Sequence, residues 1–569
     1  MNQDIRSRLD RICNILWAGG LAVPTIFVEQ ISYLIYLKLL DEREAELELK
    51  SRLVKGKNGN GNFLFPDQAS RYRWSNWRFK SGKELRDFLR DDVFPYMASL
   101  LKEEPQVAIY FQDARMEIDD PHVLKEVIDG LDGFSFAKLG PDVKGDIFEY
   151  LLQYLSRQPQ SDMGQFRTPR QIRVAMVEML DPDFGDSVYD PACGTAGFLI
   201  DALELILAKY SSEPREVPIY GEEWLDDRGW TLAQAKKEIP NLQTYRKGPG
   251  ERIPDWELLE RSIYGIEVSR QMMRISMMNL VLHGIRNAHV KRANALSELG
   301  GLSDDDLNRK YKVVLSNPPF AGMLPTDSIR KDLPTQSKKS ELLFLGLAMD
   351  ALAPGGRCAI IVPEGALFGS TSAHIELRRK LVEDYELLAV ISLPAGVFKP
   401  YAGVKTAILI FRKPSEKPAS EIKNQPRKLS GQESKIKNNR RVWFCEIKND
   451  GYDPDKITGG GRPETPERNE LPEMLRQWNT YKDSGFKTPP GTEAGALLPP
   501  GTGEAKFWWA KLGTIAENGY NLTAGRYKPQ VGEKPPEEDA TELIGKTLKL
   551  ERDIANGLEK LLKELEVVK

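Results

Sequence analysis

The sequence predicts an α/β protein with a doubly wound sheet, preceded by a helical N-terminal domain and followed by a C-terminal helix. Between about residues 140 and 413, short apolar segments alternate with helical stretches, as in strands that are linked by crossover helices. On either side of this region, apolar residues recur at helical spacing. We therefore divide the chain into residues 1–140, 141–413, 414–535 and 536–569.

The expected strands are short and mostly apolar. They cover residues 187–189, 262–266, 313–316, 358–362, 388–392 and 406–411. About residues 211–258 lie between the first two strands, and this segment is too long for an ordinary crossover loop. We expect an insertion there.

The flanking regions carry aromatic and leucine-rich patterns. Tyr72, Trp74, Trp77 and Phe79 could stack on bases, but aromatic side chains at such spacing usually pack between helices, and we favour packing. Residues 412–441 are rich in Lys and Arg and indicate a solvated linker, followed by a strand-like segment at 441–444. The expected helix from about 538 to 569 has an apolar stripe that needs a partner surface.

Composition limits the class of protein. The 569 residues are 41% hydrophobic and 29% charged, which is typical of a globular protein. The four cysteines are far apart, the four histidines show no ligand pattern, and we expect no metal site and a reduced, cytoplasmic protein. No membrane span or signal peptide is recognisable. The formal net charge of −3 argues against strong unaided binding to nucleic acid.

A run of small residues follows the first expected strand. Asp190 is followed by a turn that contains Gly194, Thr195, Ala196 and Gly197, and a helix begins near Phe198. Small residues let the backbone approach a ligand closely while the chain turns. An acid before the turn, with no Lys-Ser/Thr pair after it, favours a ligand without phosphates.

The second expected strand ends in an acid, Glu267. A carboxylate in this place can accept hydrogen bonds from both hydroxyls of a ribose. Glu223 is nearer to the glycine turn in sequence and is the alternative. We prefer Glu267 because a strand precedes it, and because a long helix and a further strand-end polar residue, Asn294, follow it.

The third element is Asn317-Pro318-Pro319-Phe320, directly after the strand at 313–316. An exocyclic aromatic amine is a poor nucleophile because its lone pair is delocalised into the ring. The Asn317 side-chain oxygen and the Pro318 carbonyl can accept its two N–H groups and localise that lone pair. The prolines fix the backbone, and Phe320 offers a ring for stacking a base.

These motifs, in this order, resemble the modification subunits of type I restriction-modification systems, which are gamma-class amino-methyltransferases with a Rossmann-like sheet. The resemblance covers nearly the whole chain. It includes the segments at 164–170, 393–398 with 405–406, and 517–522 with 526–527. It implies transfer of a methyl group from S-adenosylmethionine to N6 of an adenine that is flipped out of the duplex.

The resemblance also implies a set of site residues. The catalytic residues are Asn317, Pro318, Pro319 and Phe320. Many relatives carry an acid where this chain has Asn294, but an amide oxygen can still accept from an adenine amine. The implied cofactor-binding residues are Gln165, Phe166, Arg167, Thr168, Pro169 and Arg170 at the methionine end, Asp190, Gly194, Thr195, Ala196 and Gly197 around the sulfonium, Glu267 at the ribose, and Asn294 and Ala295 at the adenine.

The implied partners are double-stranded DNA with a flipped adenine, a specificity subunit, a second copy of the chain and a restriction subunit with helicase and nuclease activities. No helicase or base-reading motif is recognisable in the chain itself, and no membrane partner is expected. Three alternatives stay open: transfer to cytosine N4, methylation of a protein glutamine, and a catalytically silent assembly subunit.

Overall fold

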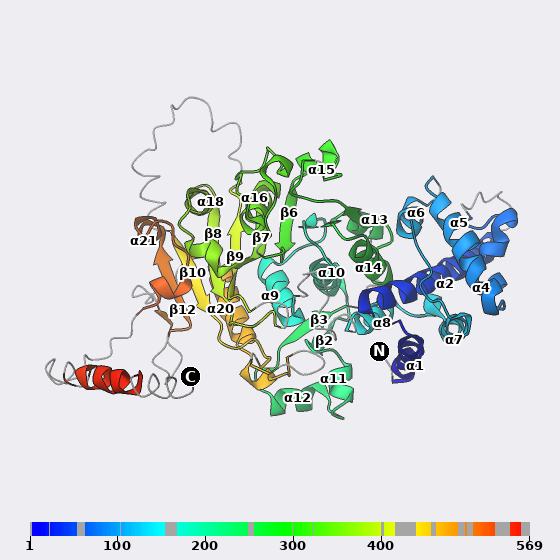
Figure 1. The fold of residues 1–569 in the computed structure, drawn as a ribbon, viewed down its shortest axis with the longest axis horizontal. Helices are drawn as coiled ribbons and strands as arrows, with labels where there is room; N and C mark the ends of the chain where they lie inside the picture. Colours follow the sequence, from blue (N-terminus) through cyan, green and yellow to red (C-terminus); the bar gives the residue numbers. More distant parts are fainter. Residues whose placement is uncertain are drawn as a thin grey trace, which may run out of the picture.

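The computed structural model describes residues 3–21, 23–53, 63–102, 104–153, 168–248, 255–298, 300–320, 322–399, 403–415, 440–453, 455–456, 462–487, 496–497, 505–529, 545 and 547–558. Within them, a helical N-terminal region lies at one end of the molecule and a large sheet with helices on both faces forms the rest (Figure 1). The α/β fold that the sequence predicts is confirmed.

The N-terminal region is all helical within its described residues. Trp74 and Trp77 are 2% and 0% exposed and lie in the core, as expected for packing aromatics, whereas Phe79 is 73% exposed. The helices are α1 (Gln3–Ala18), α2 (Pro24–Leu53), α3 (Trp74–Trp77), α4 (Gly82–Phe88), α5 (Phe94–Ser99), α6 (Pro105–Phe111), α7 (Pro121–Asp132) and α8 (Pro141–Gln153).

A ten-stranded sheet in the order β11-β12-β10-β8-β9-β7-β6-β1-β4-β5 forms the centre. The strands from β5 to β7 are parallel, and β9 is inserted antiparallel between β7 and β8. The strands are β1 (Val188–Asp190), β4 (Ile263–Glu267), β5 (His289–Arg292), β6 (Tyr311–Ser316), β7 (Leu352–Pro363), β8 (Glu386–Ser392), β9 (Thr406–Arg412), β10 (Arg441–Glu446), β11 (Ala496–Leu497) and β12 (Phe507–Lys511).

Helices cover both faces of this sheet, so its central strands are apolar on both sides. In β6, Val313 and Leu315 belong to the core on one face and Val314 to the core on the other, as strand alternation requires. One face carries α9 (Arg170–Leu180), α10 (Gly197–Tyr210), α14 (Arg270–Leu282) and α20 (Leu471–Asp483), and the other carries α16 (Ser340–Ala351), α17 (Glu364–Phe368), α18 (Ser372–Glu383) and α21 (Leu512–Glu517). Short α15 (Asp304–Asn308) precedes β6.

The expected insertion is present between β1 and β4. It contains a separate two-stranded antiparallel sheet, in which β2 pairs with β3. Its elements are β2 (Arg215–Pro218), α11 (Glu223–Asp226), α12 (Leu232–Glu238), β3 (Thr244–Lys247) and α13 (Trp256–Glu260). Trp224 donates a hydrogen bond to Glu464 at 2.6 Å, so the insertion contacts the region that follows β10.

The sheet continues beyond residue 413, where the sequence predicted the α/β domain to end. β10 pairs in parallel with β8, and β12 pairs with β10. The boundary at 413 is therefore wrong for the sheet. The sheet continues because β10 pairs with β8, which lies before a long polar segment. β10 buries Trp443 and Phe444 on the two faces of the sheet, as the inner strands do. That segment, 416–439, lies outside the described residues.

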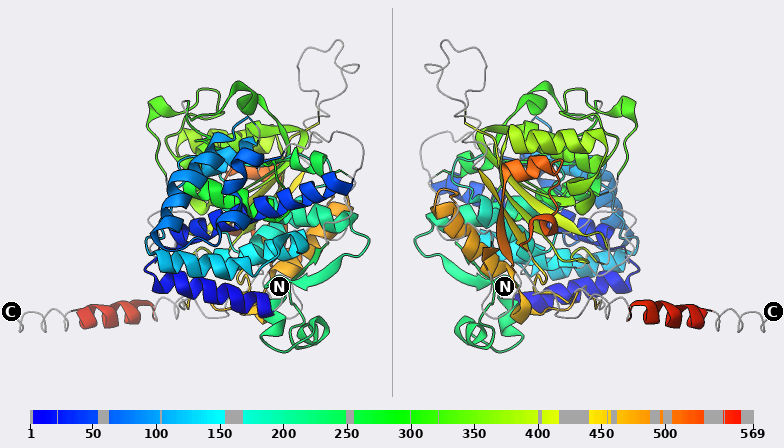
Figure 2. Two further views of the ribbon diagram at one scale, coloured as in Figure 1. Left: turned by 90° about the vertical axis from the view of Figure 1, so that its right-hand side faces the viewer. Right: turned by 90° about the vertical axis from the view of Figure 1, so that its left-hand side faces the viewer.

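The C-terminal helix is seen over part of its expected length. Residue 545 and residues 547–558 are helical, and they stand away from the rest of the molecule in both views of Figure 2. Their apolar side chains Leu548, Leu550, Ile554 and Leu558 are 51–65% exposed. In the described part of the chain, none of the helices combines the length and the apolar character that a membrane crossing requires.

A buried ion pair joins the N-terminal region to the sheet domain. Arg274 on α14 donates to Glu29 on α2 at 2.6 Å, and the two side chains are 5% and 6% exposed. Glu29 also accepts hydrogen bonds from Tyr33 at 2.8 Å and from Gln271 at 3.4 Å. This contact fixes α14 against α2.

Candidate active site

The turn after β1 is bonded to the end of the neighbouring strand β4. Cys193 N donates to the Ile266 carbonyl at 2.9 Å, and Gly194 N donates to Glu267 Oε2 at 3.1 Å. Gly194 has a φ of +55°, and Ala196, which is not a glycine, has a φ of +64°. A non-glycine residue in this region is strained, and such strain is concentrated at functional sites.

Two buried polar side chains lie against the turn from the helices behind it. Asn279 on α14 donates to the Thr195 carbonyl at 2.8 Å. A Cβ at position 197 would lie 2.7 Å from the guanidinium of Arg173, so a side chain there would displace Arg173. Arg173 in turn binds Asp201 on α10 at 2.6 Å. Neither Arg173 nor Asn279 was predicted as a site residue, although a polar residue on the buried face of an apolar helix is a usable signal.

Two acidic side chains lie at the carboxyl ends of β1 and β4. Asp190 is 1% exposed and accepts hydrogen bonds from Ala192 N at 3.0 Å and from Ser316 Oγ at 2.8 Å. Burial raises the pKa of Asp190 to about 7, and the nearby Glu267 charge acts in the same direction. Glu267 is 5% exposed, and its second oxygen accepts from Ser269 N at 2.7 Å.

Asn317 lies at the carboxyl end of β6, and the two ends of its amide have different surroundings. Nδ2 donates to the hydroxyl of Thr168 at 2.9 Å. Oδ1 is buried and has no hydrogen-bond partner among the residues that the structure describes. Because a buried polar atom without a partner is unfavourable, this oxygen suits a hydrogen-bond donor from a ligand.

The loop after Asn317 is held by a serine, Ser340, that no sequence motif marks. Ser340 Oγ, at the start of α16, accepts from Gly322 N at 2.9 Å and donates to the Pro319 carbonyl at 3.3 Å. Pro318 is buried and Pro319 is exposed. Phe320 meets Phe398 edge to face, with ring centroids 5.6 Å apart and an angle of 72° between the rings. Phe320 is half-buried, and its ring lies at the end of the same loop.

Asn294 and Ala295 follow β5, next to the end of β4. Ala293 N donates to the Glu267 carbonyl at 3.0 Å, which brings this segment beside Glu267. The side-chain oxygen of Asn294 already accepts from Leu296 N at 3.0 Å, so only its second lone pair is left for a ligand. The Ala295 carbonyl accepts from Arg330 at 3.0 Å.

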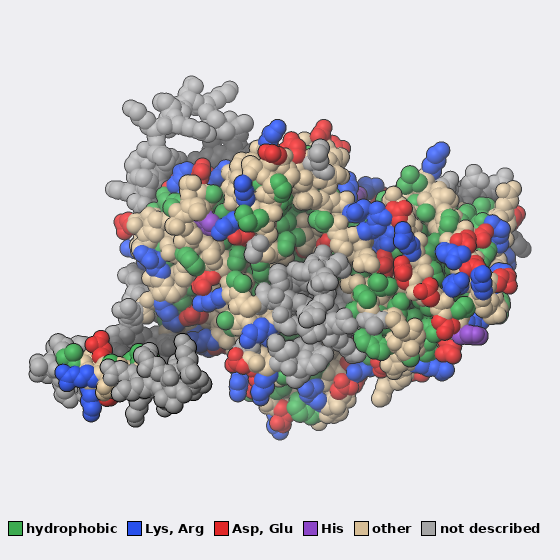
Figure 3. Space-filling model, viewed as in Figure 1, with side chains coloured by type: hydrophobic (Ala, Val, Ile, Leu, Met, Phe, Trp, Pro, Cys, Tyr) green, Lys and Arg blue, Asp and Glu red, His purple; other side chains and the backbone are tan. Residues whose placement is uncertain are grey.

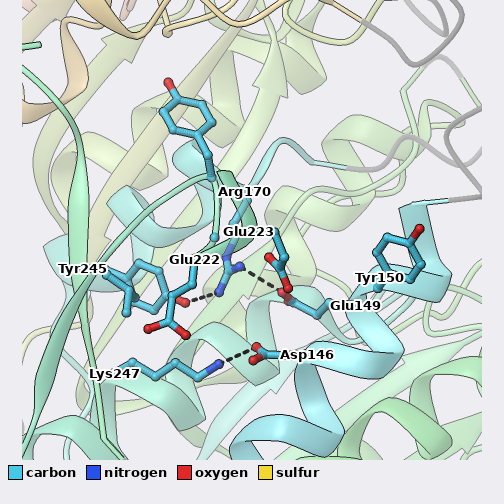
Figure 4. A pocket seen from close by; sticks show the side chains of 11 residues that line it. Asp146, Glu149, Tyr150, Arg170, Glu222, Glu223, Tyr245 and Lys247 are labelled. Carbon is cyan, nitrogen blue, oxygen red and sulfur yellow. Dashed lines mark hydrogen bonds and ion pairs between the residues drawn. The ribbon is translucent and has the colours of Figure 1, made fainter. Parts of the chain in front are cut away.

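Arg170 points into a different, polar pocket of about 50 Å³ (Figure 4). Its guanidinium binds Glu149 at 2.9 Å, Glu204 at 3.3 Å and the Tyr245 hydroxyl at 2.5 Å. Glu223, the alternative to Glu267, lines this pocket. The structure thus ties Arg170 to α8, α10 and the insertion.

The remaining predicted site residues are distributed as follows. Thr168 is buried, and Pro169 directly precedes α9. Gln165, Phe166 and Arg167 lie outside the described residues. Among the residues described, no three or more His, Cys, Asp or Glu side chains form a group that could hold a metal ion. The roles assigned to individual residues stay predictions.

Two known families match most of the chain. Residues 139–245 and 254–535 match the family described as N-6 DNA Methylase, and residues 5–131 match the HsdM N-terminal domain. These matches cover the sheet, the insertion, the strands after residue 413 and the N-terminal helices.

Individual relatives agree with the family match. The type I restriction enzyme EcoEI methylase subunit of Escherichia coli is 30% identical over 398 residues, which are 68% of this chain and 70% of that protein. A chain from a structural study of assembly and conformational transition of the type I R-M system has a TM-score of 0.66 and 27% identity, and covers 100% of this chain and 99% of that one.

A methyltransferase subunit of a type I restriction-modification system from Streptococcus thermophilus has the same fold. Its TM-score is 0.58 at 16% identity, over 93% of this chain and 99% of that one. The chain belongs to the N-6 DNA methylase family, as a relative of the methylase subunits of type I restriction enzymes.

Proposed function

We propose that the chain binds S-adenosylmethionine and methylates N6 of an adenine that is flipped out of duplex DNA, within a type I modification complex. The main support for this proposal is Oδ1 of Asn317, which is buried and has no hydrogen-bond partner among the described residues. Asn317 lies at the end of β6, and the next strands in the same sheet, β1 and β4, end in Asp190 and Glu267. An acceptor in this position suits an amine donor.

Asn317 Oδ1 and the Pro318 carbonyl would accept the two N–H groups of the amine. These bonds localise the nitrogen lone pair, and preorganised acceptors of this kind stabilise the charge that develops in the transition state. When the nitrogen gains the methyl carbon, the bond from that carbon to the sulfonium sulfur would break with its electron pair left on sulfur, and the nitrogen would lose one proton to solvent. Phe320, supported by Phe398, would stack on the flipped base.

The residues around the glycine turn fit a cationic nucleoside. S-adenosylmethionine supplies a methyl group that is already activated on a sulfonium. Asp190 and Glu267 place two carboxylates next to the turn, which favours a positive ligand and disfavours phosphate. Glu267 would accept from the ribose hydroxyls, and Asn294 with Ala295 would bind the adenine.

The same amine chemistry would serve cytosine N4 or a glutamine amide. The match to the N-6 DNA methylase family favours adenine over both, and the presence of the proposed acceptor and acids argues against a silent assembly subunit.

We expect Glu267→Ala to weaken S-adenosylmethionine binding at least tenfold and Glu223→Ala to leave it nearly unchanged. The first change removes a charged acceptor for two hydroxyls, which is worth about 1.5–3 kcal/mol. Calorimetric titration of both variants measures this. The opposite ranking would assign the ribose to the insertion instead of β4.

We also expect cofactor binding to weaken as the pH falls below about 7. Burial raises the pKa of Asp190 to about 7, so the carboxylate, which favours a cation, is lost by protonation as the pH falls through this value. Between pH 8 and pH 6 the affinity should fall by up to roughly tenfold, since each pH unit below a pKa reduces the ionised fraction about tenfold. Titrations of the wild type and of Asp190→Asn at both values test this: the variant should bind weakly at both, and an equally steep dependence in the variant would exclude Asp190 as the cause.

Efficient methylation should require a specificity subunit. On the face shown in Figure 3, Lys and Arg are interspersed with Asp and Glu, and the formal net charge is −3. Phosphate contacts dominate DNA affinity, so this surface favours weak binding by the chain alone. The exposed apolar side chains of the C-terminal helix suit packing against a partner helix.

The test combines light scattering after size-exclusion chromatography with tritium transfer to a random-sequence duplex library. The lone chain should bind cofactor and transfer little label, and addition of the specificity subunit should give a larger complex and site-selective transfer. Deletion after about residue 536 should weaken assembly and spare cofactor binding. Sequence-specific methylation by the lone chain would contradict the proposal.

A further inference from the structure

The buried amide of Asn317 can present its oxygen toward a ligand only if its nitrogen has a hydrogen-bond acceptor. In the structure that acceptor is the hydroxyl oxygen of Thr168, 2.9 Å from Nδ2. The bond joins the end of β6 to the residue that comes two positions before α9, across 149 positions of the chain. Thr168 is itself 7% exposed, so water does not readily replace it.

We propose that Thr168 is a positioning residue that acts through Asn317, by accepting from Nδ2 while Oδ1 faces the target amine. This inference rests on the proposed function, because it concerns the same acceptor. With Oδ1 toward the amine, the buried Nδ2 needs an acceptor, and Thr168 Oγ1 supplies it. Without that acceptor, the productive orientation leaves a buried donor unpaired. The reversed amide would present N–H groups to the N–H groups of the amine, which cannot bond to each other.

The position of Thr168 is fixed by buried contacts of the residues that follow it. Its carbonyl accepts from Arg173 at 3.4 Å, and Arg173 is paired with Asp201 on α10. Gln171 donates to Asp450 at 3.1 Å, and its carbonyl accepts from Gln243 at 3.1 Å.

These contacts come from three separate parts of the chain: α10, the insertion just before β3, and the segment after β10. The first turn of α9 is therefore anchored from three sides. Since Thr168 comes two positions before this turn, its hydroxyl is held at a defined point relative to β6. This anchoring gives the insertion an indirect role in the active site, through Gln243.

The discriminating measurement is turnover at saturating S-adenosylmethionine and saturating DNA, in the full complex with the specificity subunit. Thr168→Val removes the hydroxyl and keeps the shape, and we expect turnover to fall about tenfold, since the productive orientation then leaves a buried donor unpaired. Thr168→Ser keeps the hydroxyl and should restore most of the activity. Thr465→Val is the matched control, because the Thr465 hydroxyl oxygen is buried, has no hydrogen-bond partner among the described residues and lies in a different segment.

A double-mutant cycle shows whether Thr168 acts through Asn317. If it does, Thr168→Val should cause no further loss in the Asn317→Ala background, whereas independent effects would multiply. Turnover of Thr168→Val close to that of wild type, or a loss of about tenfold in both backgrounds, would overturn the inference while leaving the role of Asn317 intact. Normal turnover of Asn317→Ala would instead overturn the proposed function, and this inference with it.

Discussion

Replacement of Asn317 by alanine is expected to lower turnover at least about 100-fold, as for other lost transition-state acceptors, and to leave the affinity for S-adenosylmethionine nearly unchanged. Asn317 Oδ1 is buried and has no hydrogen-bond partner among the described residues, so it is the acceptor that the variant removes. The proposed cofactor-binding residues, the glycine turn and the two acids, lie at the ends of other strands, β1 and β4. The loss should thus appear in turnover and not in cofactor binding.

A tritium-transfer assay on the complex, with calorimetric titration of the cofactor, measures both quantities. Asn76→Ala is a suitable control, because Asn76 lies on an N-terminal helix and is exposed. Near-normal turnover of Asn317→Ala would exclude the acceptor role, and a parallel loss of cofactor binding would indicate a structural defect.

Replacement of Glu29 by alanine is expected to destabilise the chain by about 3–5 kcal/mol, the cost of removing one partner of a buried ion pair. Arg274 is only 5% exposed and would lose its counterion while keeping a bond to the Gln112 carbonyl. Because α14 also carries Asn279, which holds the glycine turn, cofactor binding should weaken in the same variant.

Denaturant unfolding, followed by the intrinsic fluorescence of the ten tryptophans, measures the change in stability. The control is a double variant, Glu29→Leu combined with Arg274→Met. It removes both charges, and an apolar pair in place of a buried ion pair can leave the free energy of unfolding nearly unchanged. If the double variant is less stable than Glu29→Ala alone, the buried charge is not the cause.

Most of the sheet could be predicted because its strands are buried on both faces. β6 and β8 are apolar runs that end in a polar residue, and β9 is apolar up to Arg412. The bounds of β5 were not predicted, although Asn294 was expected at the end of a strand: in His289–Arg292 only Val290 is buried, so the segment has no strand pattern of its own and is defined by its pairing with β4.

The candidate site was predictable where backbone chemistry restricts the residue type. A positive φ favours glycine at Gly194, the close approach of Arg173 favours it at Gly197, and Asn317 is marked by the two prolines after it. The direction of the Arg170 side chain could not be predicted in this way. Arg170 lies two residues from Thr168, but the first turn of α9 directs its side chain toward Glu149 and Tyr245, and the spacing within a motif does not show this direction.

The most direct test of adenine N6 transfer is the identity of the methylated nucleoside. DNA that has been incubated with the full complex and S-adenosylmethionine is digested, and its nucleosides are separated by mass spectrometry, with the Asn317→Ala complex as the blank. The structure and the family predict N6-methyladenine from the wild type and almost none from the variant. N4-methylcytosine, or equal N6-methyladenine from both complexes, would contradict the proposed reaction.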